Sequence, residues 1–221
     1  MSLKFNTIQK DYVGSYNTEV YKYVKKNSFC LDVGCSDGKL GQALIYNKNC
    51  IVDGIEFNSN MKNLCISKGY KNVFQCDLNT EIKNLDCSKK SYDCIILADI
   101  LEHLIDPKKT LDYFLEYLKD DGAIIISVPN VAFIQIRLNL LFGNWNYKKF
   151  GIMDETHTKF YTFRTIQELV KSANLKILRT IPYNQFKELF FLKPFQLLFP
   201  KIFSYQILVE AKKNFFKEKK F

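Results

Sequence analysis

The sequence predicts an α/β domain built on a mixed sheet of seven strands, with the last strand antiparallel and helices on both faces. From Phe29 onward, apolar runs of strand length alternate with helical segments, a pattern typical of crossover units in a parallel sheet. The first five apolar runs show little polar and apolar alternation, as expected for strands covered on both faces. With 221 residues, 47% of them hydrophobic, the chain suffices for one substantial core, so we expect residues 1–221 to form a single domain.

The elements are expected in the following order. A helical lead over residues 1–27, with a helix at Ser15–Lys26, precedes the sheet. Strands are expected at Phe29–Val33, Cys50–Ile55, Asn72–Cys76, Tyr92–Ala98, Ala123–Val128, Lys176–Tyr183 and Tyr205–Lys212. Helices are expected between them at Lys39–Asn47, Ser59–Lys68, Lys108–Lys119 and Thr165–Ala173. Residues 131–164 and 184–204 interrupt this alternation, and we expect these two insertions on the substrate side.

The first expected strand runs into a glycine turn, Leu31-Asp32-Val33-Gly34-Cys35-Ser36-Asp37-Gly38, and then into a helix. Gly34 lets the backbone come close to a ligand, and Gly38 lets the start of the helix pack against the strand. An ordinary turn between strand and helix has the same appearance. The turn alone therefore does not identify a binding site.

Two acidic residues follow the glycine turn, each at the end of an expected strand. Glu56 ends the second expected strand, about twenty residues beyond the glycine turn, where a carboxylate can bind both hydroxyls of a ribose. Asp77 follows the third expected strand, where a carboxylate can accept a hydrogen bond from an adenine amino group. The carboxyl ends of parallel strands are where open sheets of this kind bind ligands, so these features predict one nucleoside site.

Over roughly residues 28 to 212 the sequence resembles the class I, Rossmann-like methyltransferases that depend on S-adenosylmethionine (SAM). The resemblance rests on Asp32, Gly34, Gly38, Glu56, Asp77 and the segments Tyr92–Asp99 and Asp121–Val128. It implies a methyltransferase domain whose Asp32, Gly34, Glu56 and Asp77 hold SAM. The predicted cofactor site comprises Asp32, Gly34, Cys35, Gly38, Glu56, Phe57, Asp77, Leu78 and Ala98.

A nicotinamide dehydrogenase is the competing enzyme class, because it uses a similar turn and a similar ribose-binding acid. The third glycine of a dinucleotide fingerprint would fall at position 39, which is Lys39 here. The glycine spacing therefore favours the methyltransferase.

The substrate side is expected at an acid and imidazole cluster after the fourth strand, Asp99-Ile100-Leu101-Glu102-His103. At helical spacing, Asp99 would share a face with Glu102 or His103. His157, the second of the two histidines in the chain, precedes the helix expected near Thr165. One interpretation is that these side chains only satisfy backbone groups at a helix start. Another is catalysis by His157, His103 and Glu102, in which a histidine takes the proton of a substrate hydroxyl.

A third interpretation is a divalent metal site formed by Asp99, Glu102, His103 and His157. The pattern acid-x-x-Glu-His, followed by a Pro-Asn turn and a His-x-Lys-Phe segment, resembles the small-RNA 3′-terminal 2′-O-methyltransferases, and ubiquinone-pathway O-methyltransferases carry a similar stretch. In the RNA enzymes two glutamates and two histidines hold the ion. Asp99 departs from that pattern, and mixed oxygen and imidazole ligation alone does not establish a metal, so we expect no resident metal.

The segment Gly151–Thr162 also resembles bacterial methyltransferases associated with cell-surface saccharide biosynthesis. We therefore expect a small-molecule or saccharide hydroxyl as the acceptor. The net charge of +9 would suit nucleic acid or an anionic membrane surface, but lysines near helix ends and in the last ten residues are typical of solvated faces. The alternatives are a metal-dependent RNA 3′-terminal 2′-O-methyltransferase and a non-catalytic SAM-binding subunit.

The two insertions are strongly apolar. Phe186–Phe203 carries Pro194 and Pro200 and has no run near the roughly 20 residues of a spanning helix, so we expect a lid or core helix pair, with a dimer contact or shallow membrane docking as alternatives. In Val131–Phe142 polar residues recur every second position, which favours a strand, although Asn130 would suit a helix N-cap. The sequence does not predict the oligomeric state.

The seven cysteines show no close pairs with metal-ligand spacing, and several lie in expected strands. Reduced, mostly buried thiols fit this pattern best. The first residues contain no basic segment followed by a long apolar stretch, so no signal peptide is expected. Both observations favour a cytoplasmic protein.

Overall fold

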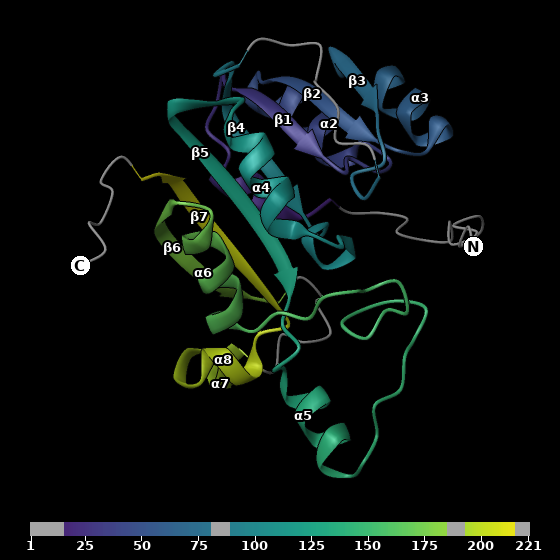
Figure 1. Cartoon of the computed structure of the whole chain (residues 1–221), viewed down its shortest axis with the longest axis vertical. Coiled ribbons are helices and arrows are strands. Elements are labelled where there is room, and N and C mark those ends of the chain that lie inside the picture. Colours follow the sequence, from purple (N-terminus) through teal and green to yellow (C-terminus); the bar gives the residue numbers. More distant parts are fainter. Residues whose placement is uncertain (1–15, 81–88, 185–192, 215–221) are drawn as a thin grey trace.

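The computed structural model of the chain describes residues 16–80, 89–184 and 193–214. Seven strands form one sheet in the order β3-β2-β1-β4-β5-β7-β6, with helices on both faces (Figure 1). The strands are β1 (Phe29–Val33), β2 (Ile51–Glu56), β3 (Asn72–Gln75), β4 (Tyr92–Ala98), β5 (Leu118–Pro129), β6 (Leu175–Tyr183) and β7 (Gln206–Lys213). The strands β1 to β5 pair in parallel, and β7 is antiparallel to both β5 and β6. The expected fold class is confirmed.

Two apolar layers hold the helices on the sheet. On one face, α1 (Thr18–Tyr23), α2 (Lys39–Lys48) and α3 (Ser59–Ser67) pack through a buried cluster that includes Val20, Leu44 and Cys65. On the other face, α4 (Pro107–Leu115) and α6 (Phe163–Ser172) pack through Phe114 and Ile166, among others. Because the strands β1 and β4 and the second half of β5 are covered on both sides, most of their residues are buried, including all of Ile124–Val128 in β5.

Short helices occupy the carboxyl-terminal side of the sheet. The 3₁₀ turn η1 (Leu101–His103) follows β4, and α5 (Ile134–Leu141) follows β5. The helices α7 (Lys193–Leu198) and α8 (Pro200–Phe203) precede β7. In Figure 1, α5 and the loop after it extend away from the sheet beyond the end of β5.

Two expectations about local structure were wrong. The helix expected to reach Lys119 ends at Leu115, because the chain joins the sheet at Leu118, beside Tyr92 of β4. The segment expected as a strand over Val131–Phe142 contains α5, since one side of it packs on a third apolar cluster with Ile152 and Met153. Asn130 does not cap that helix, whose N-cap position is Phe133, because the side-chain oxygen of Asn130 accepts from the amide of Ala132 before the helix begins.

The described cysteines are free thiols, five of them buried and Cys76 half-buried. This agrees with the expectation of reduced thiols, and Cys87 lies outside the described residues. Across the described ranges, the helices are all too short or too polar to cross a lipid bilayer.

Candidate active site

The glycine turn after β1 is held against the end of β2. The amides of Gly34 and Cys35 both donate to the carbonyl of Ile55, at 2.9 and 3.0 Å. Gly34 has φ +73°, and a Cβ placed on it would lie 2.8 Å from the side chain of Ile100. Only glycine adopts this backbone conformation without strain and also leaves room for Ile100. The turn therefore brings bare backbone to the carboxyl end of the sheet.

Glu56 lies beside this turn and is fixed by backbone amides. One carboxylate oxygen accepts from the amide of Ser36 and the other from the amide of Asn58, both at 2.9 Å. The side chain is buried, and burial raises the pKa of Glu56 above its ordinary value although the amide bonds lower it. A carboxylate held in this way keeps further lone pairs for hydroxyl donors.

Asp32, at the end of β1, is also buried and accepts a 2.7 Å hydrogen bond from the hydroxyl of Tyr70. Burial raises the pKa of Asp32 to about 6, the Tyr70 bond lowers it, and the negative charge of Glu56 raises it further. Sequence reasoning missed Tyr70, because a tyrosine after α3 carries no motif signal. The two acids and the turn form one polar wall.

The other predicted cofactor residues lie around this wall. Gly38 has φ +74° and begins α2. Cys35 is buried with its sulfur 3.4 Å from that of Cys65, and Phe57 is 52% exposed. Asp77 is exposed and accepts from the amide of Asn79, while Leu78 and Ala98 are half-buried. Their contact with a cofactor stays a prediction.

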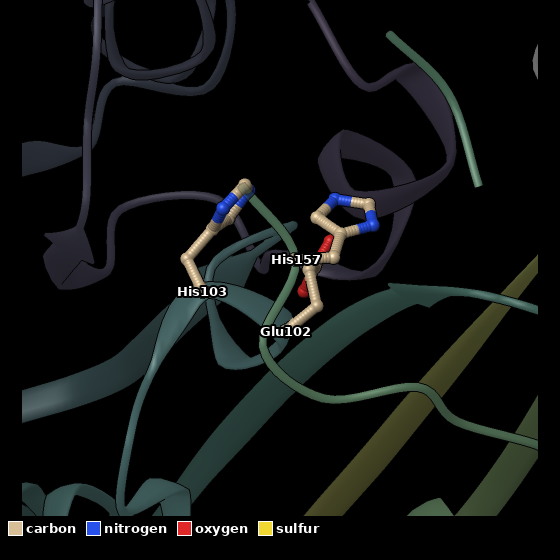
Figure 2. A group of neighbouring side chains, drawn as sticks. All are labelled: Glu102, His103 and His157. Atoms are coloured by element: carbon tan, nitrogen blue, oxygen red, sulfur yellow. The ribbon is translucent and has the colours of Figure 1, made fainter. Parts of the chain in front are cut away.

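Three of the four residues predicted on the substrate side meet in one cluster. Ligand atoms of Glu102, His103 and His157 all lie within 4.8 Å of one another. Figure 2 shows the two imidazole rings on neighbouring segments, with the Glu102 carboxylate beside His157. The ring centroids of the histidines are 4.7 Å apart, with the rings edge to face. The loop that carries His157 is held on η1 because the amides of Thr158 and Lys159 donate to the carbonyl of Glu102.

The hydrogen bonds of the two rings assign their tautomers. Nδ1 of His157 lies 3.0 Å from the carbonyl of Ile152, which can only accept, so this Nδ1 carries a proton. The hydroxyl of Thr156 donates to Asp154 at 2.6 Å and therefore accepts from Nδ1 of His103 at 3.1 Å. A proton on Nδ1 in each ring leaves Nε2 as the nitrogen that can carry a lone pair. Burial, together with the adjacent His157, lowers the pKa of His103 to about 4, so this ring is neutral at physiological pH.

Glu102 is buried, with 2% exposure, and its Oε2 has no hydrogen-bond partner among the described residues. Burial raises the pKa of Glu102 well above its ordinary value, and the charges of Asp99 and Asp154 raise it further. An unpaired buried carboxyl group is costly, and such a group is often stabilised by a proton or a cation. The cluster therefore offers two nitrogen lone pairs and one carboxyl oxygen to a ligand.

Asp99, the fourth residue of the predicted metal set, is not part of this group. It stands before η1 with φ +54°, so it does not share a helical face with Glu102 or His103, and that expectation was wrong. Its carboxylate accepts from Ser127 at 3.0 Å and from Gln206 at 2.9 Å, and Asn17 of the N-terminal segment lies 3.4 Å away. Asp99 thus links β4, β5 and β7.

Ile100 joins the two parts of the site. Its side chain packs on the backbone of Gly34, and it immediately precedes the 3₁₀ turn that carries Glu102 and His103. The loop after β3 is attached to the same turn, because Asn79 donates to the carbonyl of His103 and accepts from the amide of Ile105. The glycine turn and the imidazole cluster are therefore neighbours at the carboxyl edge of the sheet.

Comparison with known proteins identifies the family of the chain. The sequence model of a family described as a methyltransferase domain matches residues 15–180. The ubiquinone biosynthesis O-methyltransferase of Coxiella burnetii is 22% identical over 156 residues, 69% of this chain and 65% of the relative. The mitochondrial enzyme of the same name from Bos taurus is 24% identical, over 71% of this chain and 44% of the relative. The matches thus span less than two thirds of these two relatives.

Solved structures show the same fold. A SAM-dependent methyltransferase from Mesorhizobium loti has a TM-score of 0.64 at 12% identity, over 89% of this chain and 96% of that one. A SAM-dependent methyltransferase from Archaeoglobus fulgidus has a TM-score of 0.59 at 19% identity, over 89% of each chain. At these identities the likeness concerns the fold alone.

Proposed function

Because this chain belongs to the methyltransferase domain family, we propose that it transfers a methyl group from SAM to a hydroxyl oxygen of a small molecule, with a saccharide precursor as the preferred acceptor class. One observation carries the proposal. The amide-bound carboxylate of Glu56 and the glycine turn lie next to a cluster in which two imidazoles, each hydrogen-bonded at Nδ1, present Nε2. A donor-binding wall and a proton acceptor are the two parts that such a transfer needs.

The residues of the first wall fit SAM. Gly34 leaves the backbone of the turn bare, with Ile100 where a Cβ would lie, and Glu56 has the placement expected of a ribose-binding acid at the end of the second strand. Bound SAM supplies a methyl group on a sulfonium centre, which is attacked in line by the acceptor oxygen. In this proposal Glu56 binds the ribose hydroxyls, and the backbone around Gly34 lies against the methionine part.

The imidazole cluster has the proton-handling role. A hydroxyl oxygen that forms a new bond to carbon must lose its proton, and Nε2 of His157 or of His103 accepts it. Hydrogen bonds at both Nδ1 atoms fix the ring orientations. Holding the acceptor in line with the methyl group contributes most of the rate, so the base has the smaller share. The names of the ubiquinone-pathway relatives support an oxygen acceptor.

A second candidate adds a divalent cation and uses the 3′-terminal ribose of an RNA as the acceptor. The unpaired Oε2 of Glu102 and the two Nε2 lone pairs favour it, because they form a ligand set for manganese or a similar ion. In that case Glu102, His103 and His157 hold the ion, which would lower the pKa of a bound hydroxyl group.

Calorimetric titration with SAM and S-adenosylhomocysteine, followed by turnover with small hydroxyl acceptors and saccharides, tests the proposal. Binding of both nucleosides and methylation of a hydroxyl acceptor are expected. Failure to bind either would overturn the enzyme assignment, whereas binding without turnover on any acceptor would indicate a SAM-binding subunit. Activity that is lost on exhaustive chelation and restricted to RNA, with binding that weakens steeply with salt, would favour the second candidate.

A further inference from the structure

The segment from Leu138 to Phe150, here called the α5 tip, exposes large apolar side chains. It comprises the end of α5 and the first part of the loop that extends away from the sheet in Figure 1. Leu141 is 75% exposed and Phe142 is 76% exposed, and every residue from 140 to 150 is exposed. Its exposed large apolar residues are Leu138, Leu140, Leu141, Phe142, Trp145, Tyr147 and Phe150. A group of exposed apolar side chains of this size is typical of an interaction surface.

The tip is exposed because α5 is anchored from its other side. Phe133 and Ile136 are buried against Ile152 and Met153, which fixes the helix at its base. Leu138, Leu141 and Phe142 follow at helical spacing and are left outside this cluster. The helix thus presents an apolar stripe to solvent while its opposite side is packed on the protein.

The charged residues of the tip itself are the cations Lys148 and Lys149, and the acids Asp154 and Glu155 lie beside the backbone of Lys148. Residues 131–153 contain Arg137, Lys148 and Lys149 and no acidic residue. Beside the base of α5, a hollow of about 480 Å³ between α5, α6 and α8 is lined by Arg137, Arg164 and Lys201. Aromatic and leucine side chains next to lysines and arginines are the composition of segments that lie in the surface of an anionic bilayer.

We propose that the α5 tip docks on an anionic lipid bilayer, with its apolar side chains in the headgroup region and its cations on lipid phosphates. A second copy of the chain is the other occupant to consider. A symmetric contact through the tip would bring Lys148 and Lys149 of two copies together with no acidic partner in the same segment, whereas anionic lipid neutralises them.

Docking has a consequence that rests on the proposed function. Trp145 and Tyr147 pack on Phe160, with ring centroids 5.6 and 6.5 Å apart, and Phe160 packs on His157 at 6.3 Å. The docked tip would place the His157 cluster close to the bilayer surface. The acceptor class that this arrangement serves is an amphiphile whose hydroxyl group lies at the membrane surface.

Vesicle binding by the full chain tests the docking without any turnover. Trp145 is the one tryptophan of the chain, so its fluorescence reports on the tip directly. With vesicles of phosphatidylcholine containing about one third phosphatidylglycerol we expect co-sedimentation and a blue shift of emission, both weaker with phosphatidylcholine alone. The double variant Leu141→Glu, Phe142→Glu should lower the binding constant at least roughly tenfold. Lys148→Gln should lower binding about fivefold, and only to anionic vesicles.

The matched control is Tyr46→Glu on α2, a site that is 70% exposed and belongs to another part of the surface. It should bind vesicles like the unaltered chain, and circular dichroism should show that each variant is folded. Absence of vesicle binding by the unaltered chain, or full binding by the double variant, overturns the proposal. A dimer that dissociates in the double variant, without vesicle binding, assigns the tip to a second copy. Methylation of soluble saccharides alone would leave docking in place and remove the amphiphilic acceptor.

Discussion

The hydroxyl of Thr156 lies 3.1 Å from Nδ1 of His103 and gives its own proton to Asp154. A single hydroxyl proton cannot serve both neighbours, so the bond to Asp154 makes His103 the donor at Nδ1 and leaves its Nε2 as the lone pair. The chain therefore fixes the tautomer of this histidine through a threonine, much as residues behind a metal or catalytic imidazole do in other proteins.

Thr156→Val removes this hydroxyl while keeping the side-chain shape, and we expect it to lower kcat by roughly tenfold with little change in SAM affinity. Nitrogen NMR of the His103 ring should show a mixture of tautomers instead of one. Thr156→Ser is the control, since it retains the hydroxyl and should retain both rate and spectrum. An unchanged His103 spectrum in Thr156→Val would contradict the assigned role of the threonine.

His157→Ala should lower kcat by about 10²-fold or more, the lower end of what a positioned base contributes, because positioning supplies the larger share of catalysis. SAM affinity, measured by calorimetry, should stay close to that of the unaltered chain. Lys159→Ala, an exposed site in the same loop, should leave both quantities unchanged. Full turnover by His157→Ala with the true acceptor would exclude both the base and the metal roles of this residue.

Glu56→Gln should weaken SAM and S-adenosylhomocysteine binding by roughly ten- to a hundredfold, the range for lost hydrogen bonds to a charged group. Glutamine keeps one acceptor oxygen but turns its amino group toward the amide of Ser36 or of Asn58, so the buried site should also lose about 1 to 3 kcal/mol of stability. Calorimetry and thermal unfolding check the two statements. The matched control is Glu168→Gln, at an exposed ion pair on α6, which should bind SAM like the unaltered chain. If Glu56→Gln bound SAM as tightly as this control, Glu56 would not belong to the cofactor site.

Asp32 makes stability depend on pH in a defined direction. Burial raises its pKa from 3.8 to about 6, so the folded state holds the proton more tightly than the unfolded state. Its contribution is fully favourable below pH 4 and is lost as the pH rises through 6, at a cost of about 2 to 3 kcal/mol. Asp32→Asn keeps an acceptor for Tyr70 and has no such loss. Urea unfolding without SAM should therefore show the variant gaining stability over the unaltered chain between pH 4 and pH 7, and parallel pH profiles would contradict the assignment.

The sequence predicted the strands and the acid at the end of the second one well, because both signals are local. A buried parallel strand needs a continuous apolar run, and Glu56 follows such a run directly. It also predicted that Glu102, His103 and His157 belong together, although 54 residues separate the two histidines, because the motif and the loop were recognised by resemblance.

The misplaced features depend on contacts between distant segments. Asp99 was grouped with Glu102 by spacing, but its hydrogen bonds to Ser127 and Gln206 and its positive φ take it out of the cluster. Tyr70 binds Asp32 across 38 residues, which no periodicity reveals. The spacing of two between Gln135, Arg137 and Asn139 favours a strand where the structure has α5, and the exposed leucines of α5 remove the usual helical contrast between a polar and an apolar side.

Gly34→Ala tests the link between the glycine turn and the cluster, since the added Cβ would meet Ile100 at 2.8 Å on a backbone with φ +73°. We expect a loss of about 2 to 3 kcal/mol of stability and weaker SAM binding. Gly143→Ala is the matched control, because Gly143 has φ +74° with nothing within 4 Å of the added Cβ, so it isolates the backbone strain of about 1 kcal/mol. Adding Ile100→Ala to Gly34→Ala removes the clash with the new Cβ. In a double-mutant cycle it should therefore restore the part of the stability that Gly34→Ala loses beyond the loss of Gly143→Ala. Strictly additive effects would mean that Ile100 does not confine the turn, and the two halves of the site would then be independent.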